Sequence, residues 1–411
     1  MTVRGWAVLT FLVLLAGLAV AAWILVPWHR PPAPRADQLA ALAELPADRV
    51  SQAKALRGEG RLIAYPQLVL GLILALGLGL TPLGAKIVNL VPGPWPAKVL
   101  GGGLLIMLIG ELLALPFAAW RHTVMVRYGL STQDWGGWWV DVLKGYAVGL
   151  VFTTVALLGF FGLTKLAPNW WWAWGAAGAA GLVVLLSFIF PVLVEPVFNK
   201  FTPMQDSPLR TSLMRLAERD GVPVKDVLVA DASRRTTALN AYVSGIGPTR
   251  RIVVYDTLLR EAPAAEVESV VAHELGHAAD KDVVVGTVIG ALGAALLVVG
   301  LYLLGSWSWL LRMAGVDSIA APQAIGLLLA VATVIGLFSG PLQAFVSRRI
   351  EARADEHALR LTQDPATFEA MQKRLAFVNL ADPDPPAWEQ AWRGSHPTTV
   401  ERIAAARAFS R

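Results

Sequence analysis

The chain has 411 residues, of which 55% are hydrophobic and 16% are charged, and its mean hydropathy is +0.54. This apolar excess exceeds what one soluble core needs, so the composition predicts a membrane protein. The net charge of +5 is a mild excess spread over many loops, which argues against nucleic acid as a partner. The chain has no cysteine, which excludes disulfides, thiolate metal ligands and cysteine nucleophiles.

Seven apolar segments are long enough to cross the roughly 30 Å hydrocarbon layer of a membrane as helices. The first of them contains no charged residue and is either a membrane span or a signal peptide. The predicted spans cover residues 6–28, 62–80, 99–120, 145–163, 170–193, 283–304 and 325–345. The chain then divides into residues 1–194 with five spans, a polar segment 195–282, residues 283–345 with two spans, and a polar segment 346–411.

The basic residues of the loops predict how the chain is oriented, because Lys and Arg are retained on the cytoplasmic side of a membrane. This distribution predicts an N-terminus outside the cell, and both polar segments on the cytoplasmic face of the inner membrane. A cleaved signal peptide would instead place the basic loops outside. Besides the polar segments, one side collects Arg30, Arg35, Arg49, Lys54, Arg57, Arg61, Arg121, Arg127 and Lys144, and the other collects Arg4, Lys86, Lys98, Lys165 and Arg312.

Glu111 lies inside the third predicted span. A carboxylate is costly there unless it faces water or a partner, so Glu111 suggests that the helix bundle has a polar interior. The alternative is that the span ends earlier and that Glu111 lies at the membrane interface.

The segment His273-Glu274-Leu275-Gly276-His277 is an H-E-x-x-H motif within an apolar-periodic stretch. On a helix the two histidines are one turn apart and face the same way, so both imidazoles can reach one Zn²⁺ ion. Glu274 lies beside them and can accept a proton from the attacking water. The motif predicts metal-assisted hydrolysis; the alternative is a surface helix with two solvated histidines.

Catalytic zinc takes three protein ligands and an open position, and without cysteine the third ligand must be an acid or a histidine. Glu351 and Asp355 are four residues apart, so on a helix they share a face, and one can bind the metal while the other orients a ligand imidazole. The expected height above the membrane favours Glu351 as the metal ligand, because Glu351 and His277 lie equally far from the ends of two spans that can form an antiparallel hairpin. His277 lies six residues before the sixth span (283 − 277) and Glu351 six residues after the seventh (351 − 345).

Glu351 has a second interpretation, and two neighbours compete with it. It could be an ordinary charge at the membrane surface that pairs with Arg348 or Arg349. Glu356 and His357 are the nearby competitors for the metal. Six residues along a helix from Glu351, His357 points well away from its face, so we expect a packed or solvated histidine.

The polar segment before the zinc helix contains three predicted strands, at residues 227–230, 240–246 and 251–255, with Gly247 and Pro248 in the turn. Metalloproteases hold an extended substrate by pairing its backbone with an exposed strand edge. Asn240, Ala241 and Tyr242 are placed to be that edge. A plain structural hairpin is the alternative.

Five stretches of the sequence carry a resemblance to a known family. The seven predicted spans also occur in the same order as the spans of that family. The chain resembles the type I CAAX prenyl proteases, the Ste24 family of integral-membrane zinc metalloproteases. The smaller HtpX-like proteases share the zinc motifs but have fewer spans. The stretches are 191–204 (PVLVEPVFNKFTPM), 240–259 (NAYVSGIGPTRRIVVYDTLL), 273–277 (HELGH), 347–355 (SRRIEARAD) and 395–402 (SHPTTVER).

The resemblance implies a mainly α-helical fold. Seven transmembrane helices would enclose a polar chamber, capped by a cytoplasmic, gluzincin-like zinc metalloprotease domain with a small β-hairpin or meander. It also implies roles for individual residues. His273, His277 and Glu351 would bind one zinc ion, Glu274 would be the general base, Asp355 would orient a ligand, Asn240 would hold the substrate backbone, and His396 and Arg402 would lie beside the scissile bond and the substrate terminus.

The sequence thus predicts a monomeric, multi-pass zinc metalloendopeptidase whose partners are membrane lipids and protein substrates. We expect it to cleave flexible or C-terminal segments of membrane-associated proteins, prenylated CAAX proteins among them. One alternative is an HtpX-like protease for membrane-protein quality control, because the Ala- and Arg-rich composition looks bacterial. Another is a non-enzymatic transporter or scaffold with a structural metal.

Overall fold

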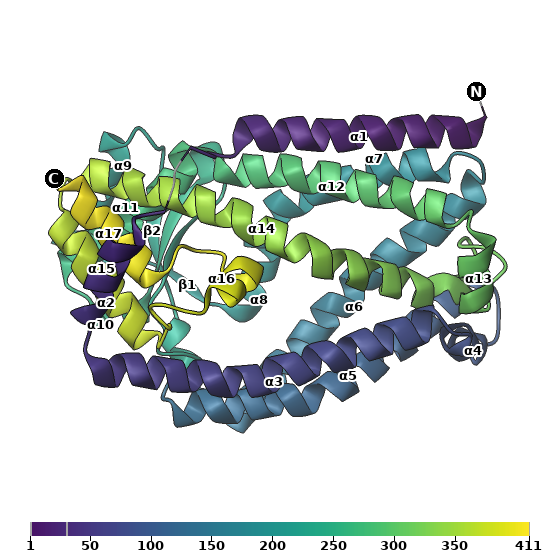
Figure 1. Cartoon of the computed structure of the whole chain (residues 1–411), viewed down its shortest axis with the longest axis horizontal. Coiled ribbons are helices and arrows are strands. Elements are labelled where there is room, and N and C mark those ends of the chain that lie inside the picture. The colour runs from purple at the N-terminus through teal and green to yellow at the C-terminus, as the bar shows by residue number, and fades with distance from the viewer. Residues whose placement is uncertain (1, 30–31, 411) are drawn as a thin grey trace.

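The computed structural model describes residues 2–29 and 32–410; Met1, Arg30, Pro31 and Arg411 lie outside the described residues. In this part of the chain, seven helices are long and apolar enough to cross a membrane, as the sequence predicts. They run roughly along the long axis of the molecule, and the polar segments gather at one end of them (Figure 1). The helices are α1 (Val3–Leu25), α3 (Ala47–Gly79), α5 (Trp95–Arg127), α6 (Trp135–Leu166), α7 (Trp171–Ile189), α12 (Asp282–Leu304) and α14 (Ile325–Thr362).

Several of these helices extend well beyond the apolar segments. Helix α14 has 38 residues, which corresponds to about 57 Å at 1.5 Å per residue. It therefore leaves the apolar region and continues without a break into the polar end, where it carries Glu351 and Asp355. Helix α7 continues through a π-helical turn, Phe190–Val194, into the short helix α8 (Glu195–Phe198). Membrane spans and protease domain thus share continuous helices.

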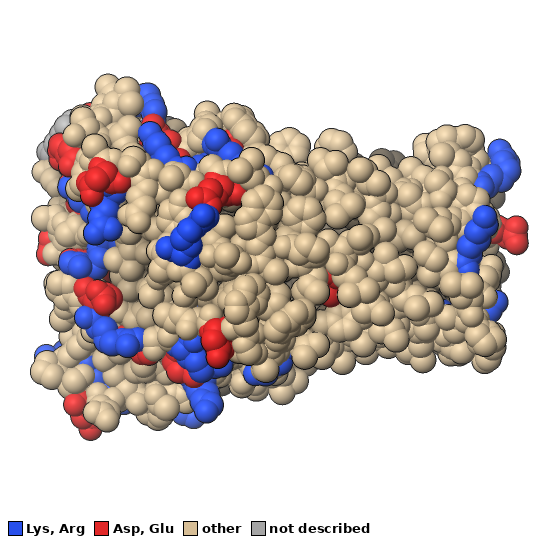
Figure 2. Space-filling view, turned by 90° about the horizontal axis from the view of Figure 1, so that it is seen from below, with Lys and Arg blue, Asp and Glu red and all other residues tan. Residues whose placement is uncertain are grey.

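Charged side chains gather at the two ends of the molecule (Figure 2). The broad band between them is almost entirely uncharged on the visible face, and the end that holds the polar segments carries most of the charge. This distribution is that of a protein with its waist in hydrocarbon and its ends in water.

The far end of α14 is fixed by close backbone packing. A Cβ atom on Gly326 would lie 2.4 Å from the carbonyl oxygen of Leu78, in the last turn of α3. Glycine at this position allows the two backbones to approach, as small residues do between membrane helices. The long helix that carries Glu351 is therefore anchored at its membrane end as well as at its polar end.

A cavity of about 770 Å³ lies between α3, α5, α6 and α14. Its walls are largely apolar, but polar side chains from all four helices, and one from outside them, also line it. Glu111 lies one residue after the lining residue Gly110 and is partly exposed. The polar lining residues are Gln67, Arg121, Thr153, Thr333 and Arg393.

The polar end contains a four-stranded mixed sheet in the order β1-β2-β4-β3. Strand β2 (Asp226–Ala230) pairs in parallel with β4 (Arg251–Tyr255), and β3 (Ala241–Ser244) pairs with β4 antiparallel. The predicted hairpin is therefore present as β3 and β4, with a 3₁₀ turn at Gly247–Thr249 between them. Two features were not predicted: the short strand β1 (Phe201–Pro203), and the crossover that places β4 between β2 and β3. This order leaves β3 at an edge of the sheet.

Helices cover the sheet and close the polar end. Apolar side chains of β2, β4 and helix α11 (Ala264–Ala279), which carries the H-E-x-x-H motif, form its core, and Val227, Ile252, Val271 and Leu275 are fully buried there. The remaining helices of the polar end are α2 (Arg35–Ala43), α9 (Pro208–Arg219), α10 (Asp256–Glu261), α15 (Pro365–Val378), α16 (Ala387–Arg393) and α17 (Thr399–Phe409). Short helices α4 (Leu83–Asn89) and α13 (Ser308–Ala314) lie at the opposite end (Figure 1).

Candidate active site

Helix α11 buries one face in the core and presents the other to α14. Val267, Val271 and Leu275 recur every four residues and are fully buried, so His273 and His277 share a different face. Helix α14 approaches closely at Gly276, where a Cβ atom would lie 3.0 Å from Cβ of His357. A residue with a Cβ atom at position 276 would require His357 to shift slightly.

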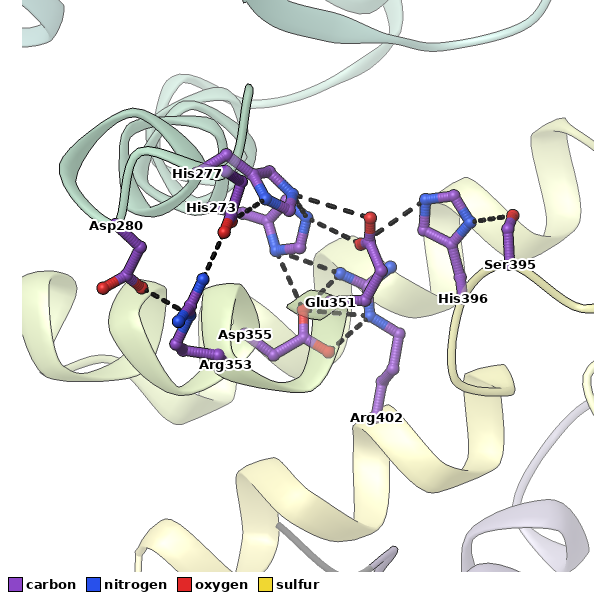
Figure 3. A network of polar contacts seen from close by, with 10 residues as sticks. His273, His277, Asp280, Glu351, Arg353, Asp355, Ser395, His396 and Arg402 are labelled. Atoms are coloured by element: carbon purple, nitrogen blue, oxygen red, sulfur yellow. Dashed lines mark hydrogen bonds and ion pairs between the residues drawn. The ribbon is translucent and has the colours of Figure 1, made fainter. Parts of the chain in front are cut away.

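Three side chains of the two helices converge in one cluster (Figure 3). Nε2 of His273 lies 3.2 Å from Nε2 of His277 and 3.2 Å from Oε2 of Glu351. Nε2 of His277 lies 3.6 Å from Oε1 of Glu351. The three ligand atoms all lie within 4.8 Å of one another, so one metal ion can be reached by all three side chains. The structure therefore places His277 and Glu351 together, as their equal distance from the predicted spans suggested.

The polar atoms of this cluster fit a metal ion. Oε2 of Glu351 is buried and receives no well-aligned hydrogen bond, although imidazole nitrogens of His273 and His396 lie 3.2 Å and 3.4 Å from it. Two imidazole nitrogens face it and each other, an arrangement that a shared cation stabilises. Two histidines and one carboxylate are also the donor set of a catalytic zinc site with an open position.

Asp355 and Arg402 support the first histidine. Oδ1 of Asp355 lies 3.0 Å from Nδ1 of His273, and Asp355 in turn accepts a hydrogen bond of 2.9 Å from Nε of Arg402. The guanidinium of Arg402 also lies 3.3 Å from Nδ1 of His273. Sequence analysis predicted that Asp355 orients a ligand, but it did not predict that Arg402, from the last helix of the chain, binds Asp355.

Asp282 is a contact of the site that sequence analysis missed. Its Oδ2 lies 2.8 Å from Nδ1 of His277. Asp282 is the first residue of α12 and stands five residues after His277, a spacing that does not share a face on a continuous helix. The only signal in the sequence was an acid directly before the predicted sixth span, 283–304.

The candidate general base, Glu274, lines a pocket of about 50 Å³ together with His277 and Val243 of strand β3. Burial raises the pKa of the Glu274 carboxyl, and the neighbouring imidazoles of His273 and His277 oppose that rise. A carboxylate with a raised pKa is a better proton acceptor for a hydrolytic reaction near neutral pH. Glu274 is therefore suited to the role that the motif predicts.

Proton competition gives a testable property of this site. Burial lowers the pKa of His273, but its contacts with Asp355 and Glu351 raise it more, to about 9. A metal ligand must be neutral, so this proton leaves when metal binds. We expect the apparent metal affinity to rise about tenfold per pH unit from neutral pH up to about 9 and then to level off. Chelator-competition titrations between pH 7 and pH 10 measure this slope.

Asp355→Asn provides the control for that titration. The variant removes the negative charge that raises the pKa of His273, so the levelling-off point should move to a lower pH. An affinity that is independent of pH in the native chain would show that no proton leaves His273 when metal binds, which contradicts either its raised pKa or its assignment as a ligand.

The strand edge that was predicted to bind substrate lies beside helix α11. Ala241 and Tyr242 belong to the edge strand β3, and Asn240 precedes it with its carbonyl accepting a 3.0 Å hydrogen bond from N of Tyr255. The hydroxyl of Tyr242 donates to Glu195 over 3.2 Å. Strand β3 pairs with β4 on one side, so its other side is the sheet edge that a substrate backbone would pair with.

His396 also reaches the cluster. Its Nε2 lies 3.4 Å from Oε2 of Glu351, and its Nδ1 lies 2.8 Å from the hydroxyl of Ser395 (Figure 3). A capping box follows, in which Thr398 and Glu401 cap the start of α17 reciprocally. The side chain of His396 is 56% exposed, so it is accessible from the open side of the site.

The two competitors for the metal lie elsewhere. Nε2 of His357 lies 2.8 Å from Oδ1 of Asp220, on the side of α14 that packs against Gly276. Glu356 forms an ion pair with Arg360, one turn further along the same helix. Neither belongs to the three-residue cluster, and for His357 this agrees with the prediction from helix geometry.

Two family models match the chain over most of its length. The model of peptidase family M48 matches residues 203–410. A second model, described as the CAAX prenyl protease N-terminal segment with five membrane helices, matches residues 69–200. The first match contains the whole metal cluster, and the second contains most of the membrane bundle that precedes it.

Comparison with individual proteins agrees with these matches. The chain is 31% identical over 310 residues to the CAAX prenyl protease 1 homolog of Oryza sativa, covering 73% of this chain and 71% of that protein. It is 30% identical over 316 residues to the uncharacterized metalloprotease YhfN of Bacillus subtilis, covering 74% and 72%.

A solved structure shows the same fold. The crystal structure of S. mikatae Ste24p superposes with a TM-score of 0.80 over 98% of this chain and 99% of that chain, at 21% identity. The fold, the family matches and the cluster of His273, His277 and Glu351 lead to one conclusion: the chain belongs to peptidase family M48, as a membrane-spanning metalloprotease of the Ste24 and CAAX prenyl protease 1 group.

Proposed function

We propose that the chain is a zinc endopeptidase that cleaves flexible or C-terminal segments of membrane-associated proteins, prenylated CAAX proteins among them. The observation that carries this proposal is the convergence of His273, His277 and Glu351 beside Glu274, on helices continuous with or adjacent to membrane spans. The names of the relatives support the CAAX part of the proposal.

In this proposal His273, His277 and Glu351 hold one zinc ion. When bound, zinc polarises the scissile carbonyl and lowers the pKa of the attacking water. Glu274 accepts a proton from that water as the water oxygen attacks the carbonyl carbon. Glu274 then donates the proton to the amide nitrogen as the carbon–nitrogen bond breaks. Asp355 keeps the imidazole of His273 in the orientation that presents Nε2 to the metal.

The substrate would bind as an extra strand. Its backbone would pair with the free edge at Asn240, Ala241 and Tyr242, which reads backbone groups and tolerates many side chains. His396 would lie beside the scissile bond, where its exposed imidazole can donate a hydrogen bond to the carbonyl oxygen. Arg402, which binds Asp355, would lie beside the substrate terminus. A site this close to membrane spans admits flexible ends and excludes folded soluble domains.

The test uses the purified full chain in detergent and matched peptides with and without a farnesyl group. We expect cleavage of both, faster for the farnesylated peptide, with loss of activity in a chelator and recovery on adding zinc. A folded globular protein with the same tail should be cut only in the tail. Absence of metal-dependent cleavage would contradict the protease. Equal cleavage rates for both peptides would contradict only the lipid-recognition part of the proposal and would leave the protease in place.

The alternatives have less support. An HtpX-like protease has fewer spans, whereas this chain matches the five-helix N-terminal model and has seven candidate spans. A non-enzymatic transporter or scaffold would leave Glu274 beside the metal cluster without a role. A membrane-protein quality-control role for the same catalytic site would be indicated by cleavage of unfolded membrane proteins that carry no lipid.

We propose a monomeric enzyme in the bacterial inner membrane, with its N-terminus outside and its active site in the cytoplasm. The soluble protease domain would comprise residues 195–282 and 346–411. More Lys and Arg side chains are visible at the end that holds the metal cluster than at the opposite end (Figure 2), and this difference supports the orientation. Reporter fusions after Pro32 and at the C-terminus should both report a cytoplasmic location, and a periplasmic signal from either would overturn the orientation.

A further inference from the structure

Both ligand histidines direct their second ring nitrogen to a carboxylate. Nδ1 of His273 faces Asp355 at 3.0 Å, and Nδ1 of His277 faces Asp282 at 2.8 Å. In each ring Nε2 faces Glu351 instead. A carboxylate that accepts the Nδ1 proton fixes the imidazole in the tautomer whose Nε2 lone pair is free for a metal. The two histidines are therefore supported in the same way, although the sequence singled out the acid for only one of them.

Each carboxylate is in turn held by an arginine. Arg402 binds Asp355, and Arg353 binds Asp282. The side chain of Asp282 is 9% exposed and that of Arg353 is 17% exposed. Charges this far from solvent are stable only when they are paired, so Asp282 is not a solvated acid at a helix start. Arg353 lies on α14 between Glu351 and Asp355, so three alternate residues of one helix serve the two histidines.

The backbone between the two helices explains how Asp282 reaches His277. On a continuous helix a residue five positions later lies about 140° around the axis, at about 100° per residue. The chain breaks that course at Lys281, which has φ of 58° in the left-handed region. A non-glycine residue is rarely found there, and such strain persists where the surrounding structure requires it. At this position it turns the first residue of α12 back over the last turn of α11.

From these contacts we infer that Asp282, held by Arg353, is a positioning residue for the metal ligand His277. It does for His277 what Asp355 does for His273. The inference rests on the proposed zinc site. It also links the sixth membrane span to the metal, because the residue that orients His277 is the first residue of that span.

Asp282→Ala tests the inference, and Asp280→Ala is its matched control. Asp280 also contacts Arg353, at 2.9 Å, and carries the same charge two residues away, but it does not contact a ligand histidine in the structure. We expect Asp282→Ala to weaken zinc binding by about 10- to 100-fold in chelator competition. With Co²⁺ in place of zinc, it should also change the visible absorption spectrum, which reports ligand geometry. Asp280→Ala should change neither.

A second variant covers the case in which Asp282→Ala does not fold, which thermal unfolding of the metal-free protein would show. Arg353→Met leaves Asp282 in place but frees it from its partner, and it should weaken zinc binding in the same direction. The inference is overturned if the folded variants bind zinc as tightly as Asp280→Ala, with an unchanged Co²⁺ spectrum. A native chain that neither binds zinc nor cleaves peptides would instead overturn the proposed function.

Discussion

Glu274→Gln should reduce peptide cleavage by about 10²- to 10⁴-fold while leaving the metal bound. The amide has nearly the same shape as the carboxylate but cannot accept a proton from water. Glu274 is not one of the three residues of the metal cluster, so the ligand set remains intact. Turnover of a peptide substrate and the zinc content of the same purified sample should be measured together.

Glu268→Gln is a suitable control for that experiment. Glu268 lies on the same helix, α11, and binds the hydroxyl of Ser212 on α9, so it shares the helix but not the metal cluster. Its variant should retain activity. Undiminished cleavage by Glu274→Gln would contradict its assignment as the general base, whereas loss of zinc from that variant would show that the carboxylate contributes to the metal site.

Glu351→Ala should abolish stoichiometric zinc binding and, with it, cleavage. Two imidazoles would remain, and a catalytic zinc site takes three protein ligands. Asp355→Ala should have a smaller effect on binding, about 10- to 100-fold, because Asp355 contacts Nδ1 of His273 and lies outside the three-residue cluster. Zinc content after dialysis and affinity in chelator competition distinguish a lost ligand from a lost orienting group.

The comparison of these two variants has a clear contradicting outcome. If Glu351→Ala kept tight, stoichiometric zinc while Asp355→Ala lost it, the two roles would have to be exchanged. Glu356→Ala is the control on the same helix, because Glu356 pairs with Arg360 and lies outside the cluster. It should leave zinc binding unchanged.

The parts of the fold that follow from local composition could be predicted from the sequence. Membrane spans require long apolar runs, and the structure has a helix at each of the seven predicted segments. The place of Glu351 beside His277 could be predicted, because the two residues lie equally far from the ends of two neighbouring predicted spans. The strand at Ala241 and Tyr242 could be predicted from two strand-like segments that are separated by a turn containing glycine and proline.

Contacts that depend on unusual backbone geometry or on distant parts of the chain could not be predicted. Asp282 reaches His277 only because Lys281 adopts a left-handed conformation, which no local pattern indicates for lysine. Arg402 reaches Asp355 because α17 packs against α14, although 47 residues separate the two side chains in sequence. The parallel pairing of β2 with β4 likewise depends on a crossover that strand patterns do not specify.

The division of the ligands between α11 and α14 also sets the order in which the site can form during synthesis. Glu351 follows His277 by 74 residues (351 − 277), and the sixth and seventh spans lie between them. At about 5–20 residues per second the ribosome needs roughly 4–15 s to make that stretch. Until then the emerging chain has both histidines and Glu274 but lacks Glu351, the third residue of the cluster. The catalytic centre is therefore completed only after the last two spans have been made, so a newly synthesised molecule becomes a protease late in its own production.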